Sequence, residues 1–117
     1  MSSASQTPID LAQLALYTGG EAELDREVLD LFRCQSALAI RRLETSLASS
    51  NSKDWRETAH SLKGSALSIG ATSLAEAAAR AEGIDPLATP AEAAEALREL
   101  TAHSRIVAAF IETYLVR

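Results

Sequence analysis

The sequence lacks most of the features that mark a secreted, a membrane-spanning or a nucleic-acid-binding protein. Cys34 is the single cysteine, so no disulfide can form within the chain. The 11 basic residues are not clustered and the net charge is -5, whereas a nucleic-acid-binding protein neutralises several phosphates with grouped basic side chains. No apolar stretch approaches the roughly 20 residues that span a bilayer. We therefore expect neither a nucleic acid nor a membrane as a partner.

The N-terminus has no secretion signal, and the composition predicts helices. Residues 1–6 contain neither a basic nor an apolar segment, so we expect a cytoplasmic location and a flexible N-terminus over residues 1–6. Hydrophobic residues make up 47% of the chain, yet Phe, Trp and Tyr are few and alanine is abundant. Alanine favours helices that pack closely. With 117 residues, the chain is long enough for one domain, which we place at residues 7–117.

Turn and capping signals divide the sequence into five helical segments. Thr7-Pro8 marks the start of a short first helix, because a threonine cap followed by proline favours the first helical turn, and Gly19-Gly20 ends it. Ser73 and Glu76 have the spacing of a capping box at the start of the fourth helix, where Thr72 is the alternative cap. Thr89-Pro90 repeats the first signal. The later helices are expected at about 21–47, 54–69, 73–84 and 90 to nearly 117.

Each of the four longer segments carries an apolar stripe at helical spacing, which predicts its buried face. The stripes are Leu24, Val28, Leu31, Phe32, Leu38, Leu43 and Leu47; Trp55, Ala59, Leu62, Ala66 and Ile69; Leu74, Ala77, Ala81 and Ile84; and Ala93, Leu97, Leu100, Ser104, Val107, Ile111 and Tyr114. Because the connections are short, each helix should lie antiparallel to the next. The expected fold is all-α: an antiparallel up-down-up-down four-helix bundle with a short additional N-terminal helix that lies across it.

The third segment holds the residues with the most distinctive chemistry. Residues three and four apart are neighbours on a helix, so Lys63 is within reach of His60, and Gly64 leaves the space beside the imidazole open. An imidazole nitrogen can attack phosphorus, and the group that it receives brings about two negative charges that need a cation and an open approach. Glycine inside a helix costs about 0.5–1 kcal/mol relative to alanine, which indicates a steric requirement at Gly64. A plain surface histidine beside a lysine explains the same spacing, so the local pattern alone does not decide.

The wider sequence resembles a known family. Residues 59–74 read Ala-His-Ser-Leu-Lys-Gly-Ser-Ala-Leu-Ser-Ile-Gly-Ala-Thr-Ser-Leu, which is similar to the signature of histidine-containing phosphotransfer (HPt) domains of multistep phosphorelays. That signature, His-x-x-Lys-Gly-Ser followed by Gly-Ala and a leucine, is matched at each characteristic position. The motif extends to Glu82, and the bundle pattern extends the resemblance over nearly the whole chain.

The resemblance implies a role for each matching residue. His60 is expected to be phosphorylated, with Nε2 turned to solvent, while Lys63 steadies the phosphoryl charge and Gly64 lets the partner's active site approach. Glu82 stands where the family often places a glutamine or glutamate that contacts the imidazole. A carboxylate that accepts a hydrogen bond from Nδ1 would fix the tautomer that leaves Nε2 free. The alternative interpretation of Glu82 is a solvated glutamate at a helix end.

Docking to a partner requires residues beyond the histidine. Leu67 lies on the same flank as His60 and is the best candidate for an exposed apolar contact, although core packing explains it equally well. Arg56 and Arg80 are expected to meet acidic groups of the partner, although exposed arginines usually contribute little individually. In the second segment, Arg41 and Arg42 are further arginines of this kind. Ala37 and Ile40 of the same segment are apolar residues that could lie beside Leu67 in a docking surface, but core packing explains them better.

Other chemistries have little support. His103 is not followed by a Lys-Gly pair, and together with His60 and Cys34 it has no metal-ligand spacing, so we expect neither a second phosphosite nor a bound metal. No glycine-rich phosphate loop is present, so no ATP-dependent kinase activity is expected. Dimerising histidine-kinase domains usually carry an acidic residue after their histidine, where this chain has Ser61.

We interpret the chain as a monomeric HPt protein that takes a phosphoryl group from a receiver aspartate onto His60 and passes it to another receiver. It has phosphotransferase chemistry toward aspartyl phosphate and no cofactor, and the resemblance implies that the partner receiver supplies Mg²⁺. Receiver domains of response regulators, a hybrid histidine kinase or both are the expected partners. Two alternatives stay open: a helical scaffold that docks a response regulator or kinase without transferring phosphate, and a structural adaptor, which would oligomerise through its heptads.

Overall fold

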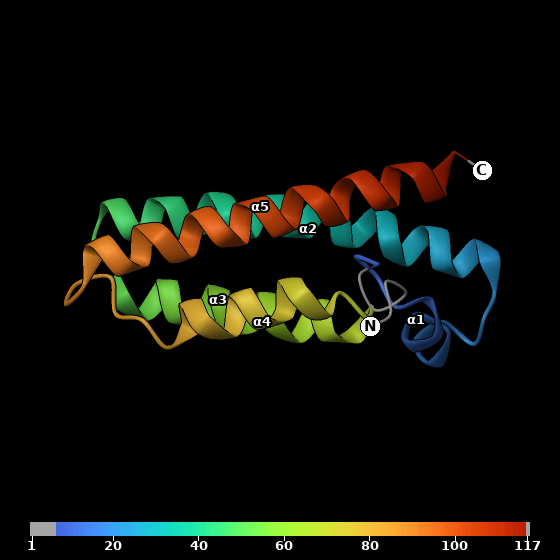
Figure 1. The fold of residues 1–117 in the computed structure, drawn as a ribbon, viewed down its shortest axis with the longest axis horizontal. Helices are drawn as coiled ribbons and strands as arrows, with labels where there is room; N and C mark the ends of the chain where they lie inside the picture. Colours follow the sequence, from blue (N-terminus) through green and yellow to red (C-terminus); the bar gives the residue numbers. More distant parts are fainter. Residues whose placement is uncertain (1–6, 117) are drawn as a thin grey trace.

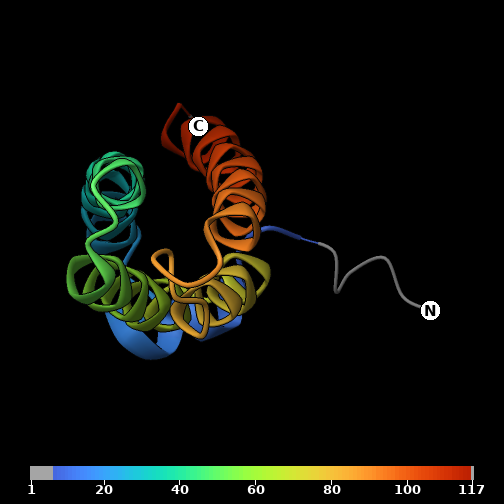
Figure 2. The same cartoon turned by 90° about the vertical axis from the view of Figure 1, so that its left-hand side faces the viewer.

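The computed structural model describes residues 7–116, which form five helices and no strand. They are α1 (Leu11–Thr18), α2 (Ala22–Ala48), α3 (Ser52–Ser68), α4 (Thr72–Glu82) and α5 (Pro90–Leu115). Helices α2 to α5 close into a ring, because α2 packs on α3 and α5 while α4 packs on the same two helices (Figure 2). The predicted up-down-up-down bundle is confirmed. The flexible N-terminus predicted for residues 1–6 lies outside the described residues.

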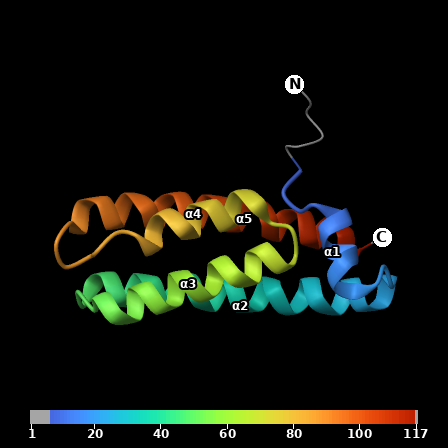
Figure 3. The ribbon, with the colours of Figure 1, turned by 90° about the horizontal axis from the view of Figure 1, so that it is seen from below.

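Helix α1 fills one end of the bundle. Helices α2 and α5 have 27 and 26 residues, whereas α3 and α4 have 17 and 11, so the first pair extends beyond the second. The crosswise helix α1 packs on α2 and α3 at that end (Figures 1 and 3). The N–H of Asp10 donates to the carbonyl of Gly70 at 2.9 Å, which ties the start of α1 to the α3–α4 turn. Gly70 has a φ of +80°, and a Cβ atom there would lie 2.6 Å from the Asp10 carbonyl oxygen, so the turn requires glycine.

The core confirms the stripes on α3 to α5 and corrects the one on α2. All five stripe residues of α3 are buried, as are most of those on α4 and α5. On α2, however, Leu31 and Leu38 are 58% and 59% exposed. They lie two residues after the buried Leu29 and Ser36 and therefore point to the opposite side of the helix. The buried face of α2 follows steps of three and four residues and includes serines at close contacts, at Leu29, Phe32, Ser36, Ile40, Leu43 and Ser46.

Two of the predicted helix caps are wrong. Asp10, and not Thr7, caps α1, because its side chain accepts hydrogen bonds from the N–H groups of residues 12 and 13. Ile9 is fully buried ahead of the helix, which keeps Pro8 and Ile9 out of the first turn. Helix α4 begins at Thr72 after the buried Ala71, with no side-chain cap, so packing of the turn replaces the expected capping box.

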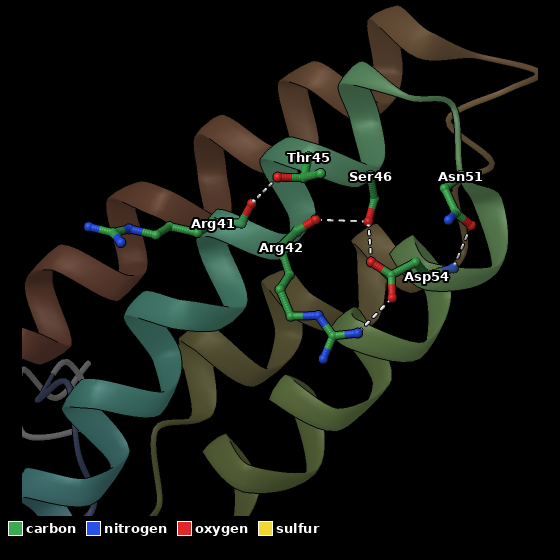
Figure 4. A network of polar contacts seen from close by, with 6 residues as sticks. All are labelled: Arg41, Arg42, Thr45, Ser46, Asn51 and Asp54. Carbon is green, nitrogen blue, oxygen red and sulfur yellow. Dashed lines mark hydrogen bonds and ion pairs between the residues drawn. The ribbon is translucent and has the colours of Figure 1, made fainter.

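A polar cluster that we call the Asp54 clasp, formed by Asp54, Arg42 and Ser46, fixes α3 against α2 (Figure 4). The Arg42 guanidinium donates to Asp54 Oδ1 at 2.7 Å, and the Ser46 hydroxyl donates to Oδ2 at 2.7 Å. The hydrogen bond from Ser46, followed by the one from Arg42, holds the pKa of the Asp54 carboxyl below its ordinary value. Asn51 caps the same helix by accepting from the N–H of Asp54. The clasp therefore sets the position of α3 close to its first turn.

Candidate functional site

His60 lies on the exposed side of α3, whose opposite face is packed into the core. The side chain of His60 is 67% exposed, while Ala59 and Leu62 beside it are buried in the core. Trp55 is fully buried about one turn earlier on the same helix. Because these neighbours fix the inner face of α3, His60 stays on an outer flank and its ring remains accessible.

Glu82 reaches His60 from the last residue of α4. The α3–α4 turn reverses the chain, and Glu82 Oε2 lies 2.8 Å from His60 Nδ1. The indole N–H of Trp55 donates to the carbonyl of Ala81 at 2.8 Å, which holds the end of α4 on α3 directly before Glu82. A buried indole N–H usually needs such a partner. The structure thus brings together two residues that are separated by 22 positions in the sequence.

The Glu82 carboxylate binds Lys63 as well as His60. Lys63 Nζ lies 3.0 Å from Oε1, and the side chains of Lys63 and Glu82 are only 31% and 24% exposed. The hydrogen bond from Lys63, followed by that from His60, holds the pKa of the Glu82 carboxyl below its ordinary value of 4.5. Glu82 is therefore ionised at neutral pH.

The ionised carboxylate determines which ring nitrogen of His60 is protonated. A carboxylate only accepts hydrogen bonds, so we assign the proton to Nδ1 from the 2.8 Å contact. Nε2 then carries the lone pair, and no residue between 7 and 116 hydrogen-bonds to it. The site offers an oriented imidazole whose free nitrogen faces outward.

Gly64 and Leu67 follow His60 by about one and two turns on the same flank of α3. A Cβ atom at Gly64 would meet nothing within 4 Å, so packing within residues 7–116 does not require glycine at this position. If a small residue is required at position 64, the requirement comes from atoms outside residues 7–116, such as those of a docked partner. Leu67 is 51% exposed, which makes it an apolar side chain available for contact one turn beyond Gly64.

The arginines divide between the site and other parts of the surface. Arg56 lies one turn before His60 on α3 and is exposed. Hydrogen bonds from the Ser52 hydroxyl and from the N–H of Leu87 hold the pKa of the Asp85 carboxyl below its ordinary value, and the positive charge of Arg56 adds a smaller contribution. Arg80 points away from His60, because its guanidinium pairs with Glu99 of α5 at 3.3 Å. By its helical spacing Arg56 shares a flank of α3 with His60, whereas the Arg80 guanidinium is turned toward Glu99 of α5.

Four residues of α2 stand apart from the site. Ile40 is buried, in agreement with the prediction of core packing, whereas Ala37 is exposed and that prediction is wrong for it. Ala37 lines a hollow between α2 and α5, one residue after the buried Ser36. Arg42 belongs to the Asp54 clasp, and Arg41 is exposed on α2.

The remaining titratable residues form no second site among residues 7–116. His103 is partly buried on α5, and Cys34 is a free, exposed thiol on α2. No group of three or more His, Cys, Asp or Glu side chains in the described range could hold a metal ion. None of the described helices is both long and apolar enough to cross a membrane.

Two contributions to the site are not predicted from the sequence. The ion pair between Lys63 and Glu82 depends on how α4 is placed along α3, which helical spacing within one segment does not give. The hydrogen bond from Trp55 to Ala81 has a weak signal: the only tryptophan of the chain lies on the core face of α3, where its N–H must find a buried acceptor.

Comparison with known proteins relates the chain to a protein family and to a solved structure. The family model described as "Hpt domain" matches residues 27–110. The fold is similar to the crystal structure of histidine-containing phosphotransfer protein B (HptB) from Pseudomonas aeruginosa PAO1, with a TM-score of 0.86 and 24% sequence identity. The alignment covers 94% of this chain and 96% of that one. No curated protein matches the sequence.

Proposed function

We propose that His60 is the phosphorylated residue of this chain, which belongs to the Hpt domain family and is a histidine phosphotransfer protein of a phosphorelay. One observation carries the assignment of His60: its Nδ1 is held 2.8 Å from the Glu82 carboxylate while the ring is 67% exposed. An imidazole held in this way has its nucleophilic nitrogen directed at an incoming partner.

The transfer step is a substitution at phosphorus. The Nε2 lone pair attacks the phosphorus of a receiver's aspartyl phosphate, the acyl oxygen–phosphorus bond breaks, and the aspartate leaves as a carboxylate. The proton on Nδ1 stays in place, so the ring becomes positively charged as the new bond forms. Glu82 accepts the hydrogen bond from that proton and stabilises the developing charge.

The residues next to His60 stabilise the charge of the phosphoryl group and allow the receiver to approach. Lys63 supplies a cation one turn from His60 for a group that carries about two negative charges. Gly64 leaves the space through which the receiver approaches. Leu67 and Arg56 form the docking surface around it, and Arg80, whose guanidinium is turned toward Glu99, lies outside that surface.

The partners are receiver domains of response regulators, a hybrid histidine kinase or both, and the Mg²⁺ of the reaction belongs to the receiver. The chain acts as a monomer, because the long apolar seam of α5 is used against α2 and α4 within one chain. The free, exposed Cys34 suits the reducing conditions of the cytoplasm. Size-exclusion chromatography tests the monomer, since an adaptor would elute as an oligomer.

Label transfer tests the role of His60. The purified chain is mixed with a panel of Mg²⁺-loaded, aspartyl-phosphorylated receivers, with His60→Gln as the test variant and His103→Gln as the matched control. We expect an acid-labile, base-stable label on the wild type and on His103→Gln, and none on His60→Gln.

The opposite results identify the competing functions. Equal labelling of His60→Gln and the wild type would move the phosphosite to another residue. A wild type that binds receivers but takes no label from any of them would be a docking scaffold. Calorimetry with the same receivers distinguishes the scaffold from a chain that binds no receiver.

A further inference from the structure

Helices α2 and α5 leave a hollow between them near the middle of their length. Its volume is about 350 Å³, at the small end of the roughly 300–1,000 Å³ of ligand sites in proteins. Ser36 of α2 and Ser104 of α5 both line the hollow. Ser104 interrupts the apolar seam of α5, and two serines fill less space than two large apolar side chains would.

The lining of this hollow combines apolar surface with arginines. Ala37 of α2 and Ala108 of α5 supply apolar atoms, while Arg41 and Arg105 enter from the same two helices. Residues three and four apart share a helix face, so each arginine stands beside an alanine of its own helix. The Arg41 side chain extends away from the contacts between α2 and α3 (Figure 4). A segment that fits here needs both apolar and acidic groups.

Arg41 and Arg105 form no ion pair with residues 7–116. Arg33, which lines the same hollow, differs because its guanidinium pairs with two carboxylates. Glu44 also lines the hollow, but it pairs with none of these arginines. Three arginines against one glutamate give the lining an excess of positive charge, although the net charge of the chain is -5.

The hollow lies on the opposite side of the bundle from His60. Glu82 of α4 contacts His60, so the imidazole belongs to the α3–α4 side of the ring of helices. Helices α2 and α5 form the side across from it (Figure 2). A molecule bound between α2 and α5 therefore leaves the imidazole accessible.

We propose that the hollow binds an acidic segment of a protein partner. A carboxylate of that segment pairs with Arg41 and Arg105, whose planar guanidinium groups suit carboxylates, and an apolar side chain packs on Ala37 and Ala108. The volume admits the side chains of a short segment and not the body of a folded domain. The segment would hold the chain on one partner while His60 meets a receiver. This last use rests on the proposed function of His60, whereas the binding does not.

Selection from a random peptide library tests the chemistry of the segment without assuming a partner. Parallel selections use the wild type and the double variant Arg41→Gln/Arg105→Gln as immobilised targets. The peptide most enriched on the wild type is then labelled with fluorescein, and anisotropy gives its Kd for the wild type and each variant. The matched control is Lys53→Gln, which removes one positive charge from an exposed position on α3. Circular dichroism confirms that each variant is folded.

Peptides enriched on the wild type should be rich in aspartate and glutamate, and the double variant should not enrich them. Each single variant should weaken binding roughly threefold and the double variant about tenfold, because ion pairs at exposed positions are individually weak. Lys53→Gln should bind as the wild type does. Transfer from receivers to His60 should stay within about twofold of the wild type, since the hollow is remote from the ring.

Two results overturn the proposal directly: selected peptides without an excess of acidic residues, and an unchanged Kd in the double variant. Slower transfer from receivers in the double variant would overturn it by assigning the arginines to receiver docking. A dimer of the wild type in size-exclusion chromatography that the double variant loses would assign the hollow to a second copy of the chain. A failure of His60 to accept phosphate leaves the peptide Kd unchanged, so the two proposals fail separately.

Discussion

Asp54 and Glu82 are two carboxylates that bridge pairs of helices with similar chemistry and different outcomes. Each binds a cation and a second donor, each has a lowered pKa, and their side chains are 29% and 24% exposed. The second donor of Asp54 is the hydroxyl of Ser46, which is 1% exposed. The second donor of Glu82 is the ring of His60, which leaves Nε2 open to solvent. A bridging carboxylate becomes a functional site when its partner retains a reactive atom at the surface.

The helix dipole further separates the two carboxylates. Asp54 lies in the first turn of α3, where a negative charge is favourable. Glu82 is the last residue of α4, where a negative charge is unfavourable. The first position stabilises the helix that carries it, and the second is explained by the contacts with His60 and Lys63.

Removing the Glu82 carboxylate should have the largest effect. In Glu82→Ala the imidazole loses its acceptor, and we expect transfer to His60 to slow at least about tenfold, because hydrogen bonds to charged groups are worth roughly 1.5–3 kcal/mol. The melting temperature should stay close to that of the wild type. Rapid-quench transfer assays and thermal melts measure both, and a large loss of melting temperature would make Glu82 a structural residue like Asp54.

A methyl group at Gly64 should separate function from stability. Nothing within residues 7–116 opposes a Cβ atom there, so Gly64→Ala should stabilise the helix by about 0.5–1 kcal/mol. Transfer should slow roughly fivefold or more, because crowding a close contact costs about 1 kcal/mol or more. Chemical denaturation measures the expected gain in stability, and the transfer assay measures the expected loss of rate. An unchanged transfer rate would mean that the receiver does not approach Gly64.

Removing the Asp54 carboxylate should affect stability and leave transfer unchanged. Asp54→Ala breaks the clasp with Arg42 and Ser46, and we expect the melting temperature to fall by a few degrees. The transfer rate should remain within about twofold of the wild type, since the clasp lies away from the histidine. A transfer defect as large as that of Glu82→Ala would show that the clasp belongs to the site.

The acid dependence of stability provides a second test of the clasp. The native pKa of Asp54 lies below its ordinary value of 3.8, so its contribution to stability is present above that value and is lost as the pH falls through the native pKa. The melting temperature of the wild type should therefore fall more steeply than that of Asp54→Ala below about pH 4. Parallel curves would mean that the carboxylate is not held in the native state.

The smallest effect is expected at Thr58, a polar group on α3 that belongs to neither network. Its hydroxyl is buried and has no hydrogen-bond partner among residues 7–116. Thr58→Val keeps the shape and should leave the free energy of unfolding unchanged or raise it by up to about 1 kcal/mol. Thr58→Ala, which also loses a methyl group, is the matched control, and a destabilised Thr58→Val would reveal a partner for the hydroxyl.

The sequence predicts the bundle well where one face of a helix is uniformly apolar. The regular steps on α3 and α5 are sufficient to identify their buried faces, whereas α2 buries serines and exposes Leu31 and Leu38. A prediction from hydrophobic residues alone is therefore wrong for part of the buried face of α2. Packing also overrides local capping signals at Ile9 and Ala71, both of which are buried beside a helix start.

The sequence predicts the part of the candidate site that lies within a single helix. The spacing of His60, Lys63 and Gly64 is a property of α3 alone. The contacts of Glu82 depend on how α4 lies along α3, which the α3–α4 turn and the bond from Trp55 to Ala81 determine. Those contacts join parts of the chain that are distant in sequence, so no local pattern contains them.

The bond from Trp55 to Ala81 gives the natural chain an optical reporter. Trp55 is the only tryptophan, it is fully buried, and its N–H is bound to the residue before Glu82. Loosening of the last turn of α4 would break that bond and change the emission of the indole. Intrinsic fluorescence can therefore follow any loosening of the end of α4 that carries Glu82, without a dye or an added tag.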